Sequence, residues 1–409
     1  MRLHMLAVVL VLPLLTEPPG AQAQSAPLGP QEPGTYVFNL ASGTWRRVGT
    51  RAVVAWSPDS RLLAVAESTD PNPAGGGARI IEVATGRETP VPVPARSSIA
   101  RFRWSPDGSR LAFTVNPFGP GDPSGLYVLS ATQGPVQELL PTAVSDFVWT
   151  PDGQAITAIA WDDPGRSLNG RIITLDAGTG TIRATIHSGS DVACLASLAW
   201  SRDGAYLAFG GPGLTQPCGD LANLGLWSWE ASTGTTRRLV TGLVDGPFWT
   251  PDGDILAMLA VPTGEARASR SVVRYHPDGR GSRILAEGIP PSLALAARPF
   301  QAAGETVLYT VLRCDVGAVF VVGRGDTPPR ELSAPGSFAY WPALSPDGAM
   351  VAWGTRGAQG NDLVRAAVDD GEPRTVLQAF PGLVVIGWSA DSGWLTFLVT
   401  AVSEPSLPC

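Results

Sequence analysis

The sequence predicts an all-β protein, an eight-bladed β-propeller built from four-stranded antiparallel blades. One observation is a strand–turn–strand phrase, RFRWSPDGSRLAF at residues 101–113, which returns as VVAWSPDSRLLAV, DFVWTPDGQAITA, SLAWSRDGAYLAF and GPFWTPDGDILAM. These copies, with three weaker ones that follow, are spaced 44 to 51 residues apart, which is typical of propeller blades. The third observation is an unpaired hairpin at each end of the repeat array. Together these features indicate a closed ring.

Each copy places a large apolar residue directly before its turn. These repeat positions are Trp56, Trp104, Trp149, Trp200, Trp249, Phe300, Leu344 and Trp388. We expect each side chain to fill the wedge between neighbouring blades, where an indole buries roughly 200 Å². A structural role is therefore expected for them, and not a ligand-binding aromatic cage.

The turn chemistry accounts for a recurrent aspartate. In SPDG the proline presets φ, the aspartate suits the following position and the glycine adopts a left-handed conformation. The aspartates are Asp59, Asp107, Asp152, Asp203, Asp252, Asp347 and Asp391. Turn geometry explains them without a metal. A second hairpin follows each turn phrase, for example RIITLDAGTGTIRAT, so each repeat supplies four strands.

The two ends of the chain predict how the ring closes. Residues 35–48, TYVFNLASGTWRRV, form an outer hairpin, and residues 383–400, LVVIGWSADSGWLTFLVT, form an inner one. Side by side they complete an eighth blade and remove two exposed sheet edges. The alternative, a seven-bladed ring, leaves one hairpin without a partner. The predicted division is a signal peptide at 1–23, a linker at 24–34, the propeller at 35–402 and a tail at 403–409.

The turn phrase resembles the TolB-type, WD40-like (PD40) propeller repeat over nearly the whole mature chain. The resemblance implies a propeller fold, whereas proteins with this repeat have many roles. TolB carries an α/β domain ahead of its propeller. Here only a short segment precedes the first strand, so a direct role in the Tol system is not expected.

Composition narrows the partners and the compartment. The formal net charge is −7 and every one of the 29 cationic side chains is an arginine, so we expect no nucleic-acid partner. The apolar run MLAVVLVLPLL at 5–15, followed by small residues up to Ala23, resembles a secretory signal. It is shorter than the about 20 residues that a membrane span needs. We expect an exported monomer, periplasmic or extracellular, without a stable membrane span.

The four cysteines fit an oxidising compartment. Cys194 and Cys218 are separated by 24 residues and are predicted to form a disulfide. The pairing of Cys314 and Cys409 stays open. No C-x-x-C pair indicates a zinc site.

Motifs for familiar catalytic chemistry are absent from the sequence. There is no G-x-S-x-G nucleophile elbow, no lysine for a nucleotide-binding P-loop, and outside the leader only His187 and His276. Both histidines are interpreted as solvated loop or turn residues. The sequence therefore predicts a protein without catalytic residues and without a cofactor, apart from calcium in the alternative below.

Charged and aromatic residues near the starts of the inner strands, and in the loops at the same end of the blades, are the candidate ligand-binding residues. They are Arg101, Arg103, Asp146, Trp161, Asp162, Asp163, Arg166 and Asp245. A funnel that combines aromatic and charged side chains is where a propeller would hold a ligand.

The main functional prediction is an exported, non-catalytic propeller that binds a protein or glycan partner. One alternative is an enzyme, a lyase or hydrolase, with a carboxylate or calcium site in the central funnel. Another is an envelope assembly scaffold. Eight-bladed scaffolds of that kind carry a DxxTGxxxW repeat, which LASGTW at 40–45 matches only in part.

Overall fold

The computed structural model describes most of the chain. The described residues are 26–67, 77–130, 134–161, 170–189, 195–211, 224–260, 269–290, 300–312, 317–323, 328–369 and 371–401. The predicted signal peptide and all four cysteines lie outside them. Within these ranges, no helix has the length and apolar character to cross a membrane.

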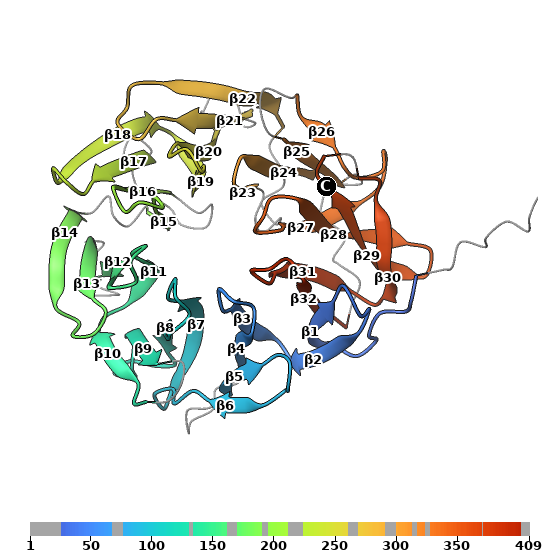
Figure 1. The fold of residues 1–409 in the computed structure, drawn as a ribbon, viewed down its shortest axis with the longest axis horizontal. Helices are drawn as coiled ribbons and strands as arrows, with labels where there is room; N and C mark the ends of the chain where they lie inside the picture. The colour runs from blue at the N-terminus through green and yellow to red at the C-terminus, as the bar shows by residue number, and fades with distance from the viewer. Residues whose placement is uncertain are drawn as a thin grey trace, which may run out of the picture.

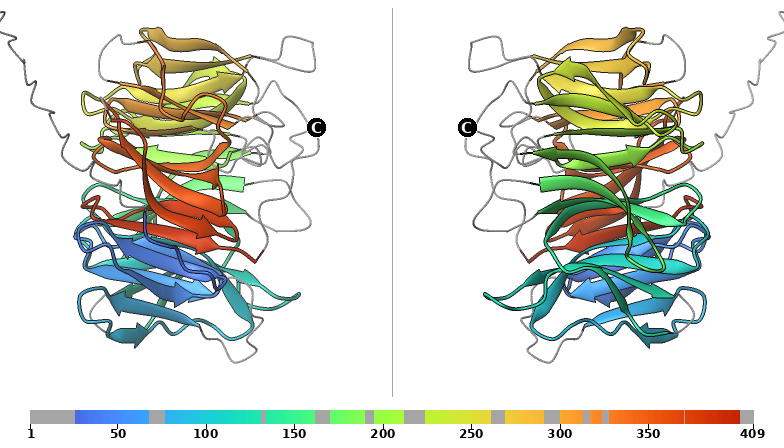
Figure 2. Two further views of the ribbon diagram at one scale, coloured as in Figure 1. Left: turned by 90° about the vertical axis from the view of Figure 1, so that its right-hand side faces the viewer. Right: turned by 90° about the vertical axis from the view of Figure 1, so that its left-hand side faces the viewer.

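In the described part of the chain, thirty-two strands form eight separate four-stranded sheets arranged around one axis (Figure 1). All neighbouring strands within a sheet are antiparallel, as two successive hairpins per repeat require. Seen from the side, the blades make a single disc-shaped layer (Figure 2). The predicted eight-bladed propeller is confirmed.

We number the blades 1 to 8 from β3 onward, with the closing blade last. Their inner strands, nearest the axis, are β3 (Ala52–Trp56), β7 (Ser97–Trp104), β11 (Val144–Trp149), β15 (Ser197–Trp200), β19 (Leu243–Trp249), β23 (Phe300–Ala303), β27 (Ala339–Leu344) and β31 (Leu383–Trp388). The second strands are β4 (Leu62–Glu67), β8 (Arg110–Pro117), β12 (Ala155–Trp161), β16 (Tyr206–Gly211), β20 (Ile255–Ala260), β24 (Thr306–Leu312), β28 (Met350–Gly357) and β32 (Trp394–Val399). The third strands are β5 (Ala78–Glu82), β9 (Gly125–Ser130), β13 (Gly170–Asp176), β17 (Gly225–Glu230), β21 (Arg270–Tyr275), β25 (Gly317–Val322), β29 (Gly360–Ala367) and β1 (Gly34–Asn39). The outer strands are β6 (Glu88–Pro90), β10 (Gln137–Leu140), β14 (Ile182–Gly189), β18 (Thr235–Thr241), β22 (Ser282–Ile289), β26 (Arg330–Glu331), β30 (Arg374–Phe380) and β2 (Trp45–Gly49).

Blade 8 joins the two ends of the described chain, in the order β2-β1-β32-β31. Strand β1 pairs with β32 over its whole length, from Gly34 opposite Val399 to Asn39 opposite Trp394. The two terminal hairpins therefore share one blade, as their sequences predict, and the seven-bladed alternative is wrong.

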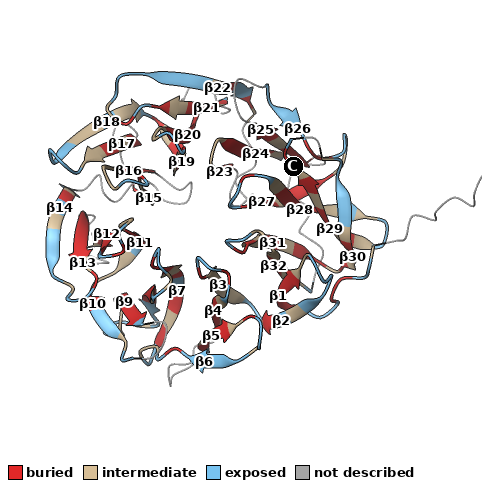
Figure 3. Ribbon diagram, in the orientation of Figure 1, coloured by how far each residue is buried: buried red, intermediate tan, exposed pale blue. Residues whose placement is uncertain are grey.

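Apolar side chains gather between the blades. Among the described residues there are eight buried clusters, and each combines residues of two neighbouring blades, one cluster for every interface around the ring. Second strands such as β12 are buried almost end to end, whereas short outer strands such as β6 and β26 are exposed (Figure 3). The inner strands of each blade are therefore covered on both faces by the neighbouring blades. The hydrophobic core consists of these inter-blade interfaces, arranged in a ring.

The repeat tryptophans lie at these interfaces and also bond across them. Four indole N–H groups donate to a backbone carbonyl on the inner strand of the preceding blade, at 2.9–3.0 Å: Trp104 to Ala55, Trp149 to Arg103, Trp249 to Ala199 and Trp388 to Ala343. The other two donate to threonine hydroxyls, Trp56 to Thr396 and Trp200 to Thr157. Each indole thus supplies apolar area and one directed hydrogen bond.

A serine or threonine two residues before each turn aspartate completes the turn. In all seven copies its hydroxyl donates to the aspartate Oδ1 at 2.5–2.6 Å. At the first of these turns, Ser57 also accepts the amide N–H of Leu62, which starts the second strand. The hydroxyl therefore links the carboxylate to the returning strand, and no metal is needed to hold the aspartate.

Replacing Trp388 tests the indole hydrogen bond. We expect Trp388→Phe to lower the free energy of unfolding by about 1–3 kcal/mol, because the buried Ala343 carbonyl loses its donor. Trp388→Ala should lower it by about 3–5 kcal/mol through the added cavity. Urea denaturation measures both. Trp45→Phe is the control, since Trp45 is 43% exposed and makes no such bond; equal losses for Trp388→Phe and Trp45→Phe would contradict this role.

The turn aspartates predict a loss of stability in acid. The Ser105 hydroxyl, with Ser109, lowers the pKa of Asp107 to about 2, against an ordinary value of 3.8. The equivalent hydroxyl lowers the pKa of Asp59, Asp152 and Asp203. A lowered folded-state pKa stabilises the fold above the unfolded value, and that stability is lost as pH falls toward the folded value. The free energy of unfolding should therefore fall between about pH 4 and pH 2. Asp107→Asn should weaken this pH dependence, and an unchanged slope would refute the assignment.

Candidate ligand-binding site at the inner rim

The inner rim, meaning the inner strands of the eight blades, carries four of the eight candidate ligand-binding residues. Arg101 and Arg103 lie on β7, Asp146 on β11 and Asp245 on β19. Trp161 ends the second strand β12 and is half-buried. The loop residues Asp162, Asp163 and Arg166 lie outside the described residues.

Three of these residues form one ionic cluster. Arg101 Nη1 and Arg103 Nη2 lie 3.2 and 3.0 Å from the same atom, Asp146 Oδ1. The other oxygen, Oδ2, accepts the backbone N–H of Leu198 on β15 at 3.2 Å. The carboxylate is almost fully buried, while the Arg101 side chain is 46% exposed. The cluster therefore ties together the inner strands of blades 2, 3 and 4.

A β-bulge aims the two arginines at this carboxylate. In β7 the register shifts between Ile99 and Arg101, so Ala100 is an extra residue opposite β8. Side chains of a strand alternate between its faces, and a bulge resets that alternation. Both Ala100 and Arg101 are exposed as a result, and Arg103 follows on the face of Arg101. An equivalent shift between Val144 and Asp146 occurs in β11.

The repeat provides an internal comparison for this cluster. Arg101 and Asp146 both stand three residues before a repeat tryptophan. The corresponding residues in five other blades are uncharged: Val53, Ser197, Gly246, Trp341 and Val385. Among the ion pairs of the described residues, those of Asp146 alone connect inner strands of different blades. The charges are therefore not a requirement of the propeller fold.

Asp245 belongs to a separate pair within blade 5. Its Oδ2 lies 3.8 Å from Nη1 of the buried Arg270, on β21. Burial raises the pKa of Asp245, and the positive charge of Arg270 opposes that rise. The sequence grouped Asp245 with Arg101, Arg103 and Asp146, but in the structure it pairs within its own blade.

The described residues contain no group of three or more histidine, cysteine, aspartate or glutamate side chains placed to hold a metal ion. Asp146 faces two guanidinium groups, an arrangement that repels a cation. Its carboxylate is therefore unsuited to calcium, whereas the arginines beside it suit an anion.

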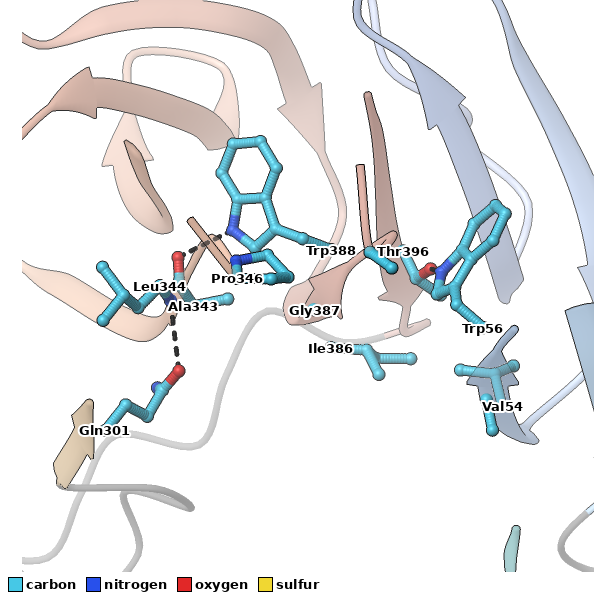
Figure 4. Close-up of a pocket in the computed structure, with 12 residues that line it drawn as sticks. Val54, Trp56, Gln301, Ala343, Leu344, Pro346, Ile386, Gly387, Trp388 and Thr396 are labelled. Carbon is cyan, nitrogen blue, oxygen red and sulfur yellow. Dashed lines mark hydrogen bonds between the residues drawn. The ribbon is translucent and has the colours of Figure 1, made fainter. Parts of the chain in front are cut away.

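An apolar cavity of about 380 Å³ occupies another part of the inner rim (Figure 4). Its lining comes from blades 1, 6, 7 and 8 and includes Val54, Trp56, Ile386 and Trp388. Gln301, on β23, borders it. The volume accommodates one or two apolar side chains of a ligand.

Gln301 has a structural role that the sequence did not reveal. Its amide Nε2 donates to the Pro342 carbonyl at 2.7 Å. Its Oε1 accepts the Leu344 N–H at 3.1 Å (Figure 4). Leu344 occupies a repeat position without an indole. The side chain of Gln301 thus supplies the polar link between blades 6 and 7 that an indole provides elsewhere. The sequence feature that could have revealed this role is the glutamine directly after Phe300, which is the repeat residue of blade 6.

No family model matches the chain. A curated relative from Bacillus subtilis (strain 168), described as an uncharacterized peptidase, is 30% identical over 172 residues. That match covers 41% of this chain and 22% of the relative, so the chain spans only a small part of that protein.

Two peptidases are among the similar solved structures. A prolyl endopeptidase matches with a TM-score of 0.57 at 14% identity, over 82% of this chain and 51% of its own. Dipeptidyl peptidase 4 of Porphyromonas gingivalis matches with a TM-score of 0.58 at 11% identity, over 84% and 56%. An oligogalacturonate lyase in complex with manganese matches with a TM-score of 0.52 at 13% identity, over 87% and 89%. At these identities the likeness shows the propeller fold.

The structure confirms the propeller fold that the TolB-type resemblance implies, whereas no family model confirms the PD40 repeat family. TolB from Acinetobacter baumannii is a structural neighbour with a TM-score of 0.42 at 16% identity, over 86% of this chain and 80% of its own.

The predictions of a non-catalytic binding module and of a protein that is not an enzyme are contradicted. The curated relative is described as a peptidase, and enzymes recur among the structural neighbours. The prediction relied on missing catalytic motifs. Because the chain spans about half of the peptidase structures and less of the curated relative, missing motifs within it do not argue against catalysis. The enzyme alternative agrees better with the comparisons.

Removing the Asp146 carboxylate should destabilise three blades at once. We expect Asp146→Ala to lower the free energy of unfolding by about 3–5 kcal/mol, because it leaves buried donors and two guanidinium groups without their shared partner. Arg101→Gln, at a half-exposed site, should cost about 0–1 kcal/mol. Urea denaturation of both variants measures the difference. Equal, small losses would show that the cluster does not hold the blades together.

Proposed function

We propose that the chain works in a hydrolytic enzyme that acts on peptides, with its inner rim binding the substrate. The sequence similarity to the Bacillus subtilis peptidase carries this proposal, since the structural neighbours show the fold alone. The leader-like segment at the start of the chain supports an exported enzyme.

The geometry of the inner rim fits this proposal. The apolar cavity offers space for uncharged side chains, and the cluster of Arg101, Arg103 and Asp146 offers hydrogen-bond donors with an excess of positive charge. A peptide presents polar backbone groups along its whole length, together with side chains that are apolar or charged according to its sequence. We assign substrate binding to these residues, and no bond-breaking role to Asp146, because both of its oxygens are engaged.

The proposal is tested with an affinity-tagged full-length chain expressed in its native cells and purified with any associated polypeptides. A panel of fluorogenic peptides and, in parallel, polygalacturonate are offered as substrates. We expect peptide hydrolysis that disappears when the tagged chain is depleted. Cleavage of polygalacturonate with the peptides left intact would favour a lyase, and turnover of neither substrate class would overturn the proposal.

A further inference from the structure

We propose that Arg101 and Arg103 form a subsite for a carboxylate group of the substrate, so that the enzyme prefers acidic peptides. The inference rests on the function proposed above. The carboxylate has two sources in a peptide, the side chain of glutamate or aspartate and the free C-terminus, and both present the same planar anion.

The net charge of the cluster of Arg101, Arg103 and Asp146 favours a bound anion. Two guanidinium groups share one carboxylate, Asp146, which leaves the cluster with a net charge of +1 in a protein of formal charge −7. A bound carboxylate would make the cluster neutral. Placing a second anion there is therefore favourable, whereas a cation would be repelled.

Arg101 has N–H donors that the described part of the protein does not use. A guanidinium has five N–H donors in a planar fork that matches a carboxylate. Arg101 approaches Asp146 through Nη1 alone, and its side chain is 46% exposed. Among the described residues, no partner engages its Nε or Nη2. The outer edge of Arg101 is therefore open to a ligand.

Arg103 and Asp146 are held in place by the protein before a ligand binds. Arg103 donates to Asp146 through Nη2, and its guanidinium lies over the Phe147 ring with 5.8 Å between Cζ and the ring centroid. Asp146 is itself fixed by the Leu198 amide. Donors held in place before binding lose little conformational freedom when a ligand arrives.

Other blades of the propeller close without charged residues at this position. Five other blades carry uncharged residues at the position of Arg101 and Asp146, and their interfaces close through apolar clusters and indole hydrogen bonds. The charged cluster of blades 2 to 4 is therefore better explained by ligand binding than by a requirement of the propeller fold.

Isothermal titration with three synthetic hexapeptides tests the subsite. One is capped at both ends and carries glutamates, the second is its capped glutamine counterpart, and the third is the glutamine peptide with a free C-terminal carboxylate. We expect the glutamate peptide, or the free-carboxylate peptide, to bind about tenfold more tightly than the capped glutamine peptide. The tighter of the two identifies the source of the carboxylate.

Substitutions of Arg101 and Arg103 test whether the carboxylate binds at this cluster. Arg101→Gln and Arg103→Gln should each remove most of the preference for the carboxylate, and Arg101→Lys should restore part of it, because lysine keeps the charge without the fork. Arg183→Gln is the matched control: Arg183 is 44% exposed and pairs with Asp176, but on outer strand β14. Thermal melts confirm that each variant is folded. Equal binding of all three peptides, or an unchanged preference in Arg101→Gln, would overturn the subsite.

The two proposals fail differently. Peptide hydrolysis without any preference for a carboxylate would refute the subsite and leave the peptidase function intact. Binding of the acidic peptide that depends on Arg101, in a preparation that hydrolyses no peptide, would refute the peptidase function and leave the anion-binding subsite.

Discussion

The structure depends on the pairing of β1 with β32. A blade has two apolar faces and buries both only when a blade stands on each side of it, so an open arc would leave two faces exposed to water. Six β1–β32 residue pairs, from Gly34–Val399 to Asn39–Trp394, make the last blade out of both ends of the chain. The interface clusters on its two sides then close the ring.

Among the described residues, a polar side chain at or beside the repeat position bonds across seven of the eight interfaces, whereas the interface between blades 5 and 6 has Phe300 there, packed against Phe248. Six blades use an indole that donates to the preceding blade. Blade 7 has Leu344 at that position, and Gln301 of blade 6 reaches across with both ends of its amide. At this interface the glutamine pairs the Pro342 carbonyl and the Leu344 N–H group, which would be costly to leave unpaired at this depth.

The sequence predicted the features that repeat and missed those that occur once. Strand–turn–strand phrases recur, so their period revealed the blades, and the terminal hairpins revealed the closure. The seven serine or threonine hydroxyls that hold the turn aspartates were visible in the same alignment, but their bond to the carboxylate was not inferred. The bulge at Ala100 leaves no mark in the sequence, because it depends on register with β8. Without it, the joining of Arg101 and Arg103 to Asp146, and the separation of Asp245 from them, could not be foreseen.

The cluster around Asp146 combines a structural and a binding role without conflict. The carboxylate uses Oδ1 for the arginines and Oδ2 for the Leu198 amide, so both of its oxygens already have protein partners. The two guanidinium groups carry more donors than one carboxylate can accept. The buried carboxylate of Asp146 therefore holds the blades together, and the partly exposed guanidinium of Arg101 is left to bind a ligand. A carboxylate ligand bound there would contact Arg101. The guanidinium groups would lie between this ligand and Asp146, so the two anions would not repel each other at close range.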